Sequence, residues 1–244
     1  MKGPTMRILV LQHAVSEHPG SFREVMAREG HSMHAIELDE GERIPALDAF
    51  DILLVMGGPM DVWEHDKHPW LIEEMAAIRD WVTAGRPYLG LCLGHQLLAQ
   101  ACGGHVGPMD GTPEVGIARV PVMPDPIFVG LPALCTCFQW HGAEVKRLPE
   151  NAVLLASSEA CAIQAFRLGD VAYGLQFHME LTHTTATEWG ALPEYAAALE
   201  RVRGPGGLPE IQAEVAAHYP ALNQAAAQIF SNFLRLAETT LTAA

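Results

Sequence analysis

Short apolar runs recur along the first hundred residues, and each run stops at turn residues. The runs at 6–12, 51–56 and 87–91 are rich in leucine and β-branched residues. Continuous runs of this length are typical of strands that are buried on both faces of a parallel sheet. The segment 31–38 is a plausible further strand. The pattern therefore predicts a sheet built from parallel strands.

Segments with helical spacing lie between these runs. The segment 21–29 begins with a serine and is followed by Gly30, a common stop signal for a helix. The segment 70–83 has an apolar residue at every third or fourth position and ends before Gly85. Because strands and helices alternate, we expect an α/β fold with a mostly parallel central sheet flanked by helices, as in flavodoxin-like proteins.

The pattern of predicted elements changes in the second half of the chain. Short strands are expected at 115–122, 153–157, 162–167 and 171–177, and Gly169-Asp170 reads as a hairpin turn. This predicts a small antiparallel section. A helical C-terminal extension at 183–240 follows, with a loop at 203–209. We expect residues 1–244 to form a single domain.

Composition and charge exclude several classes of function. The 244 residues are 49% hydrophobic, and 15 basic against 29 acidic residues give a formal charge of −14. Such a charge repels nucleic acid and anionic membranes. The first apolar run is too short for a signal peptide, and no stretch approaches the length of a membrane span. Five scattered cysteines show no disulfide framework, so we expect a soluble, cytoplasmic protein.

One cysteine stands out, because it lies between two glycines where a strand gives way to a helix. The sequence Leu-Gly-Leu-Cys-Leu-Gly-His-Gln at 89–96 has the layout of a nucleophile elbow around Cys92. Gly90 and Gly94 would allow a tight turn that holds Cys92 in a strained conformation with its sulfur exposed. The helix that begins there would favour the thiolate. Cys92 is therefore the candidate nucleophile.

A cysteine nucleophile needs a base, and the base needs a partner that fixes its orientation. The sequence Gly-Leu-Gln-Phe-His-Met-Glu at 174–180 ends a predicted strand. In an extended chain, residues two apart face the same side, so His178 and Glu180 are expected to lie next to each other. Of the twelve histidines in the chain, His178 is the one with an acid at this spacing after so strong a strand.

The two segments 89–96 and 174–180, with histidine before the acid in the chain, closely resemble the class I glutamine amidotransferases, in particular proteins similar to the amidotransferase domain of GMP synthase. The resemblance extends over most of residues 6–180. It includes Val-Met-Gly-Gly-Pro-Met at 55–60, which is similar to the family's oxyanion strand, and Phe-Gln-Trp-His-Gly-Ala-Glu-Val at 138–145, which is similar to its substrate-side loop.

The resemblance implies a role for each matching residue. Cys92 would be the nucleophile, His178 the general base and acid, and Glu180 the residue that orients the histidine. The backbone N–H groups of Gly58 and Leu93 would form the oxyanion hole.

The resemblance also implies a substrate pocket. Gln96, one helical turn after the cysteine, would contact the amino-acid head of the substrate. Met60 stands near this pocket where the family often has glycine, and Met179 stands where proline is common. The backbone of three consecutive residues would complete the pocket: Trp140, His141 and Gly142. We expect residues 182–209 to form the part of the pocket wall that determines which substrate binds, because loops around a fixed site decide substrate choice.

The expected reaction is hydrolysis of a glutamine side-chain amide through a γ-glutamyl thioester, with delivery of ammonia to an acceptor. No phosphate-binding glycine loop occurs, so an acceptor-binding synthetase would be a separate chain. A γ-glutamyl peptidase or hydrolase is the alternative with the same chemistry. A non-catalytic regulatory or thiol stress protein on the same fold is the alternative of a different class.

Two further groups of polar residues are candidates for binding. Acidic and histidine residues crowd 61–68, but this segment also holds tryptophan and proline, and we expect a solvated loop over the pocket mouth with no metal. No cofactor is expected either. His13 and His18 follow the first strand, at the sheet edge where ligands bind in such folds, and are candidates to contact an acceptor.

Overall fold

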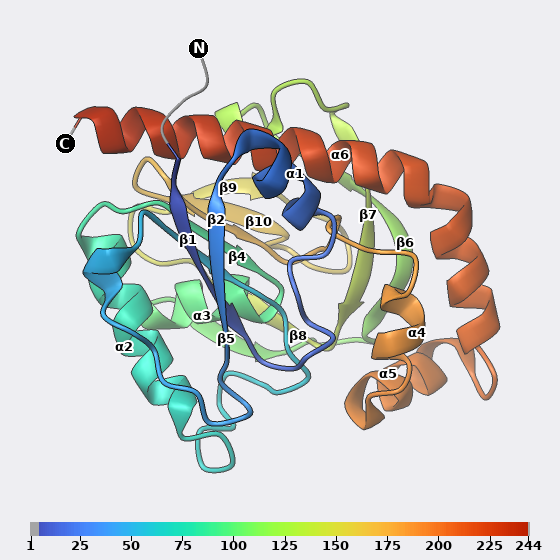
Figure 1. Cartoon of the computed structure of the whole chain (residues 1–244). Coiled ribbons are helices and arrows are strands. Elements are labelled where there is room, and N and C mark those ends of the chain that lie inside the picture. The colour runs from blue at the N-terminus through green and yellow to red at the C-terminus, as the bar shows by residue number, and fades with distance from the viewer. Residues whose placement is uncertain (1–4, 244) are drawn as a thin grey trace.

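The computed structural model describes residues 5–243 and places seven strands in one central sheet. Neighbouring strands run parallel from β2 to β11, and β10 and β9 add an antiparallel section at one edge. The α/β fold with a mostly parallel sheet is thus confirmed (Figure 1). In spatial order the strands are β2 (Ser32–Glu37), β1 (Arg7–Gln12), β3 (Ile52–Val55), β4 (Tyr88–Leu91), β11 (Ala172–Leu175), β10 (Ala165–Leu168) and β9 (Val153–Ala156).

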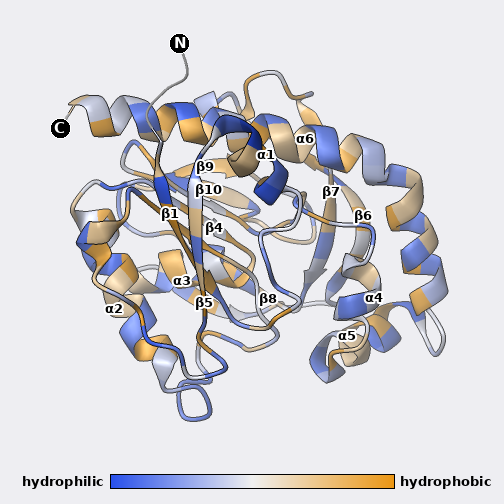
Figure 2. Ribbon diagram, viewed as in Figure 1, coloured by the Kyte–Doolittle hydropathy of each residue, from blue (hydrophilic) through white to orange (hydrophobic). Residues whose placement is uncertain are grey.

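Helices cover both faces of this sheet. Successive residues of a strand point to opposite faces, so Val10 packs with the helices on one side and Leu9 with those on the other. Figure 2 shows the central strands as the most hydrophobic part of the chain. The helices α1 (Phe22–Glu29) and α6 (Leu208–Ala243) pack on the first face, and α2 (Trp70–Thr83) and α3 (Leu93–Ala101) pack on the second.

Two antiparallel pairs lie beside the central sheet. β6 (Glu114–Pro121) pairs with β7 (Leu134–His141), and β5 (His105–Pro108) pairs with β8 (Ala143–Arg147). The sequence predicted β6 but read 138–145 as a loop, which is wrong. β7 pairs with β6 over its whole length, so partner contacts rather than local pattern make this segment a strand.

The C-terminal part is helical, as predicted. It comprises α4 (Thr185–Trp189), α5 (Pro193–Arg203) and α6, and the break between α5 and α6 falls inside the predicted loop. α6 is 36 residues long and contains Pro220. A proline removes one helical hydrogen bond and kinks a helix, in agreement with the change of direction of α6 in Figure 1. Two short 3-10 turns lie at Leu47–Ala49 and Pro126–Phe128.

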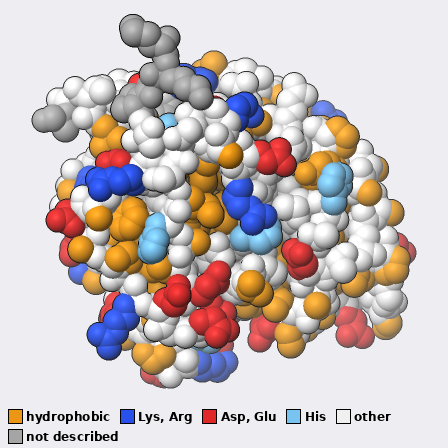
Figure 3. Space-filling model, in the orientation of Figure 1, with side chains coloured by type: hydrophobic (Ala, Val, Ile, Leu, Met, Phe, Trp, Pro, Cys, Tyr) orange, Lys and Arg blue, Asp and Glu red, His pale blue; other side chains and the backbone are white. Residues whose placement is uncertain are grey.

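The first two helices of this extension cover the β6–β7 pair. Their apolar side chains form a third core with the aromatic residues of β7. On the face drawn in Figure 3, acidic side chains gather low in the view and basic ones are scattered, in keeping with the negative charge. Within residues 5–243, none of the helices is both long enough and apolar enough to cross a membrane.

Candidate active site

Cys92 lies in the tight turn that joins β4 to α3. Its φ of 49° and ψ of −101° are strained values for a residue with a side chain. A Cβ atom at Gly94 would stand 2.3 Å from the carbonyl oxygen of Val55, and one at Gly90 would stand 2.5 Å from the backbone of Gly94. Both positions therefore require glycine, which agrees with the elbow predicted from the sequence.

The exposure of Cys92 differs from the prediction of an exposed sulfur. The residue is only 4% exposed, and side chains of α5 line the same cavity as Cys92. It lines a cavity of about 290 Å³ whose wall also includes Gly58 and Tyr195. A small substrate would thus meet the sulfur inside a covered cavity rather than on an open surface.

His178 and Glu180 are brought together as the period-two spacing indicates. Oε1 of Glu180 is 2.6 Å from Nδ1 of His178, and Oε2 accepts the backbone N–H of Met179 at 2.9 Å. The strand itself ends at Leu175, earlier than predicted. His178 is held in extended form instead by two backbone hydrogen bonds with Phe138 of β7, at 2.8 and 2.9 Å.

The imidazole of His178 lies between a carboxylate and a thiol. Burial alone would lower the pKa of His178, but the Glu180 carboxylate and the Cys92 thiol raise it well above its usual value. Burial would raise the pKa of Glu180, but His178 holds it below the usual value. The second ring nitrogen, Nε2, makes no hydrogen bond to any residue in 5–243. It is therefore free to accept a proton.

The two predicted oxyanion donors flank the elbow. Gly58 lines the cavity with Cys92, and a Cβ atom there would stand within 2.8 Å of Leu93 and Met60. Leu93 is the first residue of α3, and the first N–H groups of a helix have no partner inside it. The geometry brings both residues to the cysteine.

The predicted pocket residues line the same cavity: Met60, Gln96, Trp140, His141 and Gly142. Nε2 of Gln96 donates to the carbonyl of Ala143 at 3.2 Å and to Oε1 of Gln176 at 3.1 Å. Gln176 in turn donates to the Cys92 sulfur at 3.5 Å. Sequence reasoning missed Gln176, although it lies two residues before His178 in the same motif.

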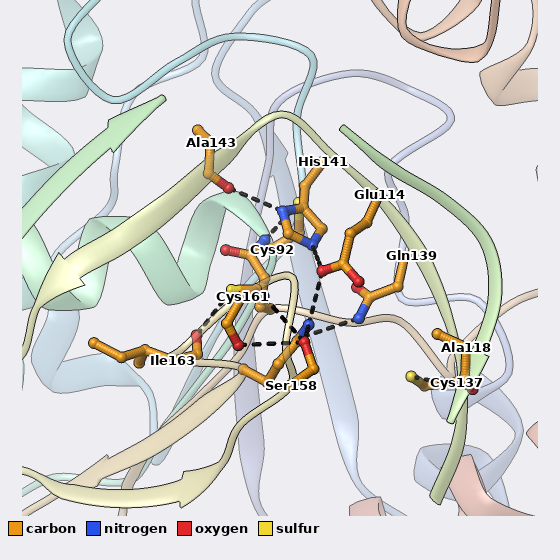
Figure 4. Close-up of polar contacts among 12 residues, drawn as sticks. Cys92, Glu114, Ala118, Cys137, Gln139, His141, Ala143, Ser158, Cys161 and Ile163 are labelled. Atoms are coloured by element: carbon orange, nitrogen blue, oxygen red, sulfur yellow. Dashed lines mark hydrogen bonds and ion pairs between the residues drawn. The ribbon is translucent and has the colours of Figure 1, made fainter. Parts of the chain in front are cut away.

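A buried polar network fixes the turn between β7 and β8. Nδ1 of His141 donates to the Ala143 carbonyl at 2.9 Å, and Nε2 lies 3.1 Å from Oε2 of Glu114. Figure 4 shows the ring between these two oxygens, close to Cys92. Gln164 adds a hydrogen bond to the same Glu114 oxygen at 2.8 Å. The network holds in place the backbone at 140–142 that was expected to meet the substrate.

A second carboxyl lies near His178, and it was also missed. Glu17 is buried and accepts the hydroxyl of Tyr195, from α5, at 2.5 Å. A Cβ atom at Gly57 would stand 2.5 Å from Oε2 of Glu17 and 3.2 Å from Cε1 of His178, so both groups border the same spot. Burial raises the pKa of Glu17 to about 7, against the opposing effect of His178. An acid just after the first strand was the available signal.

Of the two histidines that follow the first strand, His13 does not behave as expected. His13 is 1% exposed, and both its ring nitrogens have protein partners, so it does not face an acceptor. His18 is half-buried and accepts the backbone N–H of Gly20 at 3.0 Å. Gly57, Glu74 and Trp70 contact the ring of His13, which explains why His13 is covered.

The extension supplies one wall of the cavity, in the region 182–209 where the wall that determines substrate choice was expected. Glu194, Tyr195 and Arg201 lie on the face of α5 that lines it. Arg201 is the one lysine or arginine in the lining formed by the described residues. Asp61 and Glu64 come from the loop predicted to lie over the pocket mouth. Across residues 5–243 no group of three potential metal ligands was found.

Comparison with known proteins places this site in a family. The sequence model of "Glutamine amidotransferase class-I" matches residues 21–189. The glutamine amidotransferase-like protein YfeJ of Salmonella typhimurium is 30% identical over 187 residues, which cover 72% of this chain and 77% of that protein. A glutamine-hydrolyzing GMP synthase subunit of Pyrococcus abyssi is 43% identical over 100 residues, which cover 40% of this chain and about half (53%) of that protein.

The fold is similar to that of solved members. The crystal structure of a glutamine amidotransferase from Thermotoga maritima matches with a TM-score of 0.85 at 26% identity, covering 95% of this chain and 99% of that one. The chain therefore belongs to the class I glutamine amidotransferases, a family of cysteine-dependent amidohydrolases.

Proposed function

We propose that this protein hydrolyses the side-chain amide of glutamine, or of a related γ-glutamyl compound, through a thioester on Cys92. The observation that carries the proposal is the arrangement around one covered cavity. A strained cysteine lines it, and the imidazole of His178, buried and with one free nitrogen, lies near this cysteine and 2.6 Å from a carboxylate. This order of groups is what nucleophilic catalysis by a thiol requires.

The first half of the reaction forms the thioester. Nε2 of His178 holds the proton of the Cys92 thiol, and the resulting thiolate attacks the amide carbon of the substrate. The amide oxygen becomes an oxyanion that accepts the N–H groups of Gly58 and Leu93. The loss of one such donor costs about 3 kcal/mol of transition-state stabilisation. The intermediate collapses when His178 gives its proton to the departing nitrogen, which leaves as ammonia.

The second half restores the enzyme. His178, neutral again, takes a proton from a water molecule, and the hydroxide attacks the thioester carbon. Glutamate leaves and the sulfur recovers the proton from His178. Glu180 keeps Nδ1 protonated and the ring oriented throughout, because a carboxylate at 2.6 Å accepts the N–H of that nitrogen.

The charges of the cavity wall fit the head of an amino acid. Glutamine carries an α-carboxylate and an α-ammonium group, and the lining offers Arg201 for the first and three acidic side chains for the second: Asp61, Glu64 and Glu194. Gln96 lines the same cavity as Cys92, and we propose that it contacts the same head group.

The names of the relatives bear on the fate of the ammonia. One of them is a glutamine-hydrolyzing subunit of GMP synthase. We propose that this protein, too, passes ammonia to an acceptor held by a separate synthetase chain.

The experiment is a panel assay on the purified protein. Glutamine and a series of γ-glutamyl compounds are incubated with it, and the release of glutamate is followed by mass. We expect release from at least one compound and none by Cys92→Ala. Negligible hydrolysis of glutamine alone, rising when a synthetase partner is added, would support the role in ammonia supply. Efficient cleavage of a γ-glutamyl conjugate without a partner would favour the hydrolase, and equal release by Cys92→Ala would refute the proposal.

A further inference from the structure

A second buried histidine, His13, lies next to the Gly57–Gly58 segment that borders the cavity. Nδ1 of His13 is 2.7 Å from the carbonyl oxygen of Gly57, and Nε2 is 2.9 Å from Oε1 of Glu74 on α2. His13 is 1% exposed and Glu74 is 0% exposed. The ring also stacks on Trp70, with centroids 5.4 Å apart and planes 14° apart. The imidazole is thus held on its face and at both nitrogens.

The Gly57 carbonyl and the Glu74 carboxylate determine which nitrogens of the His13 ring carry hydrogen. A backbone carbonyl and a carboxylate both accept hydrogen bonds and have none to donate. Both nitrogens of His13 therefore carry hydrogen, and the ring forms a buried ion pair with Glu74. Burial alone would lower the pKa of His13, but Glu74 raises it above its usual value, with further help from the Gly57 carbonyl and Glu17.

The bond to Gly57 acts on the expected oxyanion donor. The carbonyl of Gly57 and the N–H of Gly58 belong to one planar peptide unit, and every peptide bond between the described residues is trans. In a trans peptide the C=O and the N–H point in opposite directions. A hydrogen bond that fixes the Gly57 carbonyl toward His13 therefore fixes the Gly58 N–H in the direction away from His13, and Gly58 lines the cavity whereas His13 does not.

This peptide unit needs such an anchor. Two successive glycines have no side chain to restrict rotation of the peptide plane between them. Neither can become bulkier, because a Cβ atom at Gly57 would stand 2.5 Å from Glu17 and one at Gly58 would stand 2.7 Å from Met60. The orientation of the plane thus depends on its hydrogen bonds, and an imidazolium is a stronger donor than a neutral group.

We propose that His13, held by Glu74, is a positioning residue that aims the Gly58 N–H into the oxyanion hole and polarises it. The inference rests on the proposed function, since it assumes that an oxyanion forms next to Cys92. His13 does not touch the substrate. Its contribution is to keep the donor oriented before the reaction begins, which is the condition for a large electrostatic effect.

The test compares three variants with the wild type. His13→Ala removes the anchor. In His13→Asn the side-chain amide takes the place of Nδ1 and donates to the Gly57 carbonyl without a charge. Glu74→Gln keeps the His13 contact but removes the counter-charge. Thermal melting is recorded for each, so that loss of fold is seen directly. If His13→Ala does not fold, the comparison rests on the Asn and Gln variants.

Three measurements distinguish a loss of the Gly58 N–H orientation from a general loss of structure at the site. Hydrolysis of the best γ-glutamyl substrate gives kcat and KM. Binding of an aldehyde analogue of glutamine, which forms a tetrahedral adduct on the sulfur, reports the oxyanion hole. Alkylation of Cys92 by iodoacetamide needs no oxyanion hole and reports only the thiolate.

We expect His13→Ala to lower kcat on the order of 10²-fold, with little change in KM. The affinity for the aldehyde should fall by a similar factor, and alkylation should stay within about threefold, since no oxyanion forms in that step. His13→Asn should recover most of the loss, and Glu74→Gln should cost about tenfold.

Unchanged kcat in His13→Ala, or alkylation that falls in step with kcat, would overturn the inference and leave the proposed function intact. A wild-type protein that hydrolyses none of the panel would instead refute the proposed function, and the inference with it.

Discussion

Two buried histidine–glutamate pairs border the Gly57–Gly58 segment, and they differ at the second ring nitrogen of the histidine. In each pair a carboxylate oxygen lies within 3 Å of a ring nitrogen, 2.6 Å for His178 with Glu180 and 2.9 Å for His13 with Glu74. All four side chains are buried. The other nitrogen of His13 is bound to the Gly57 carbonyl, whereas that of His178 has no partner among the described residues.

This difference distinguishes a histidine that can transfer a proton from one that only supports the structure. Burial, an adjacent carboxylate and a raised pKa are common to both histidines. The state of the second nitrogen and the neighbouring thiol of Cys92 distinguish His178 from His13. A ring with one free nitrogen next to a thiol can gain and lose a proton during a reaction, whereas a ring bound at both ends has no proton to exchange without losing a hydrogen bond.

The strongest test of the contrast is to replace the histidine with the free nitrogen. His178→Gln should lower kcat/KM by at least about 10⁴-fold, because no group remains to accept the thiol proton. His105→Gln, at an exposed position, is the matched control and should leave turnover unchanged. Initial rates on the best panel substrate give the answer. A His178→Gln variant within tenfold of wild type would remove His178 from the mechanism.

Replacement of the two carboxylates, Glu180 and Glu74, should lower kcat to different extents. Glu180→Gln should lower kcat by about 10² to 10⁴-fold, since the His178 ring loses the group that fixes its protonated nitrogen. Glu74→Gln should cost only about tenfold, because it acts through His13 and a backbone peptide. Exposed Glu159→Gln serves as the control. Equal losses in the two variants would erase the distinction between the pairs.

Replacement of a residue that binds the substrate should change KM, whereas replacement of a residue in either histidine–glutamate pair should change kcat. Arg201→Gln is expected to raise KM about tenfold with kcat nearly unchanged, because a contact to the carboxylate head is present before and during the reaction. Exposed Arg119→Gln is the control. Saturation curves for the two variants decide the point. A fall in kcat without a rise in KM would place Arg201 outside the head-group site.

The smallest effect concerns Glu17, whose charge acts on both histidines. Because its pKa is raised to about 7, the folded state binds more protons than the unfolded state between about pH 4.5 and pH 7. The contribution of Glu17 to stability is therefore lost as pH rises through this window, by about 1 to 3 kcal/mol.

Glu17→Gln removes this titration and keeps a polar group next to Tyr195. Relative to wild type, the variant should gain stability as pH rises from 5 to 8, measured by urea unfolding. The exposed Glu24→Gln should follow the wild-type curve. A constant difference between Glu17→Gln and wild type across this range would show that Glu17 does not titrate there.

The sequence revealed the pair whose members are two residues apart. The glycines around Cys92 and the His178–Glu180 spacing are local patterns, and the parallel strands follow from uninterrupted apolar runs. Glu74 could not be matched to His13, because 61 residues separate them and nothing in α2 distinguishes a buried glutamate from an exposed one.

The burial of the site also could not be predicted from the sequence. The contact between Tyr195 and Glu17 joins residues 178 positions apart, and it depends on how α5 packs on the β6–β7 pair. The sequence placed the walls of the cavity in this region but gave no sign that they would bury Cys92. Burial by a distant element is a tertiary property that local spacing does not encode.

The most direct test is to trap the thioester. The protein is mixed with the best substrate of the panel, quenched in acid, digested, and examined by mass spectrometry. We predict one γ-glutamyl group on the peptide that contains Cys92, and none in Cys92→Ala. Turnover that continues in Cys92→Ala, or an adduct confined to another cysteine, would contradict this prediction.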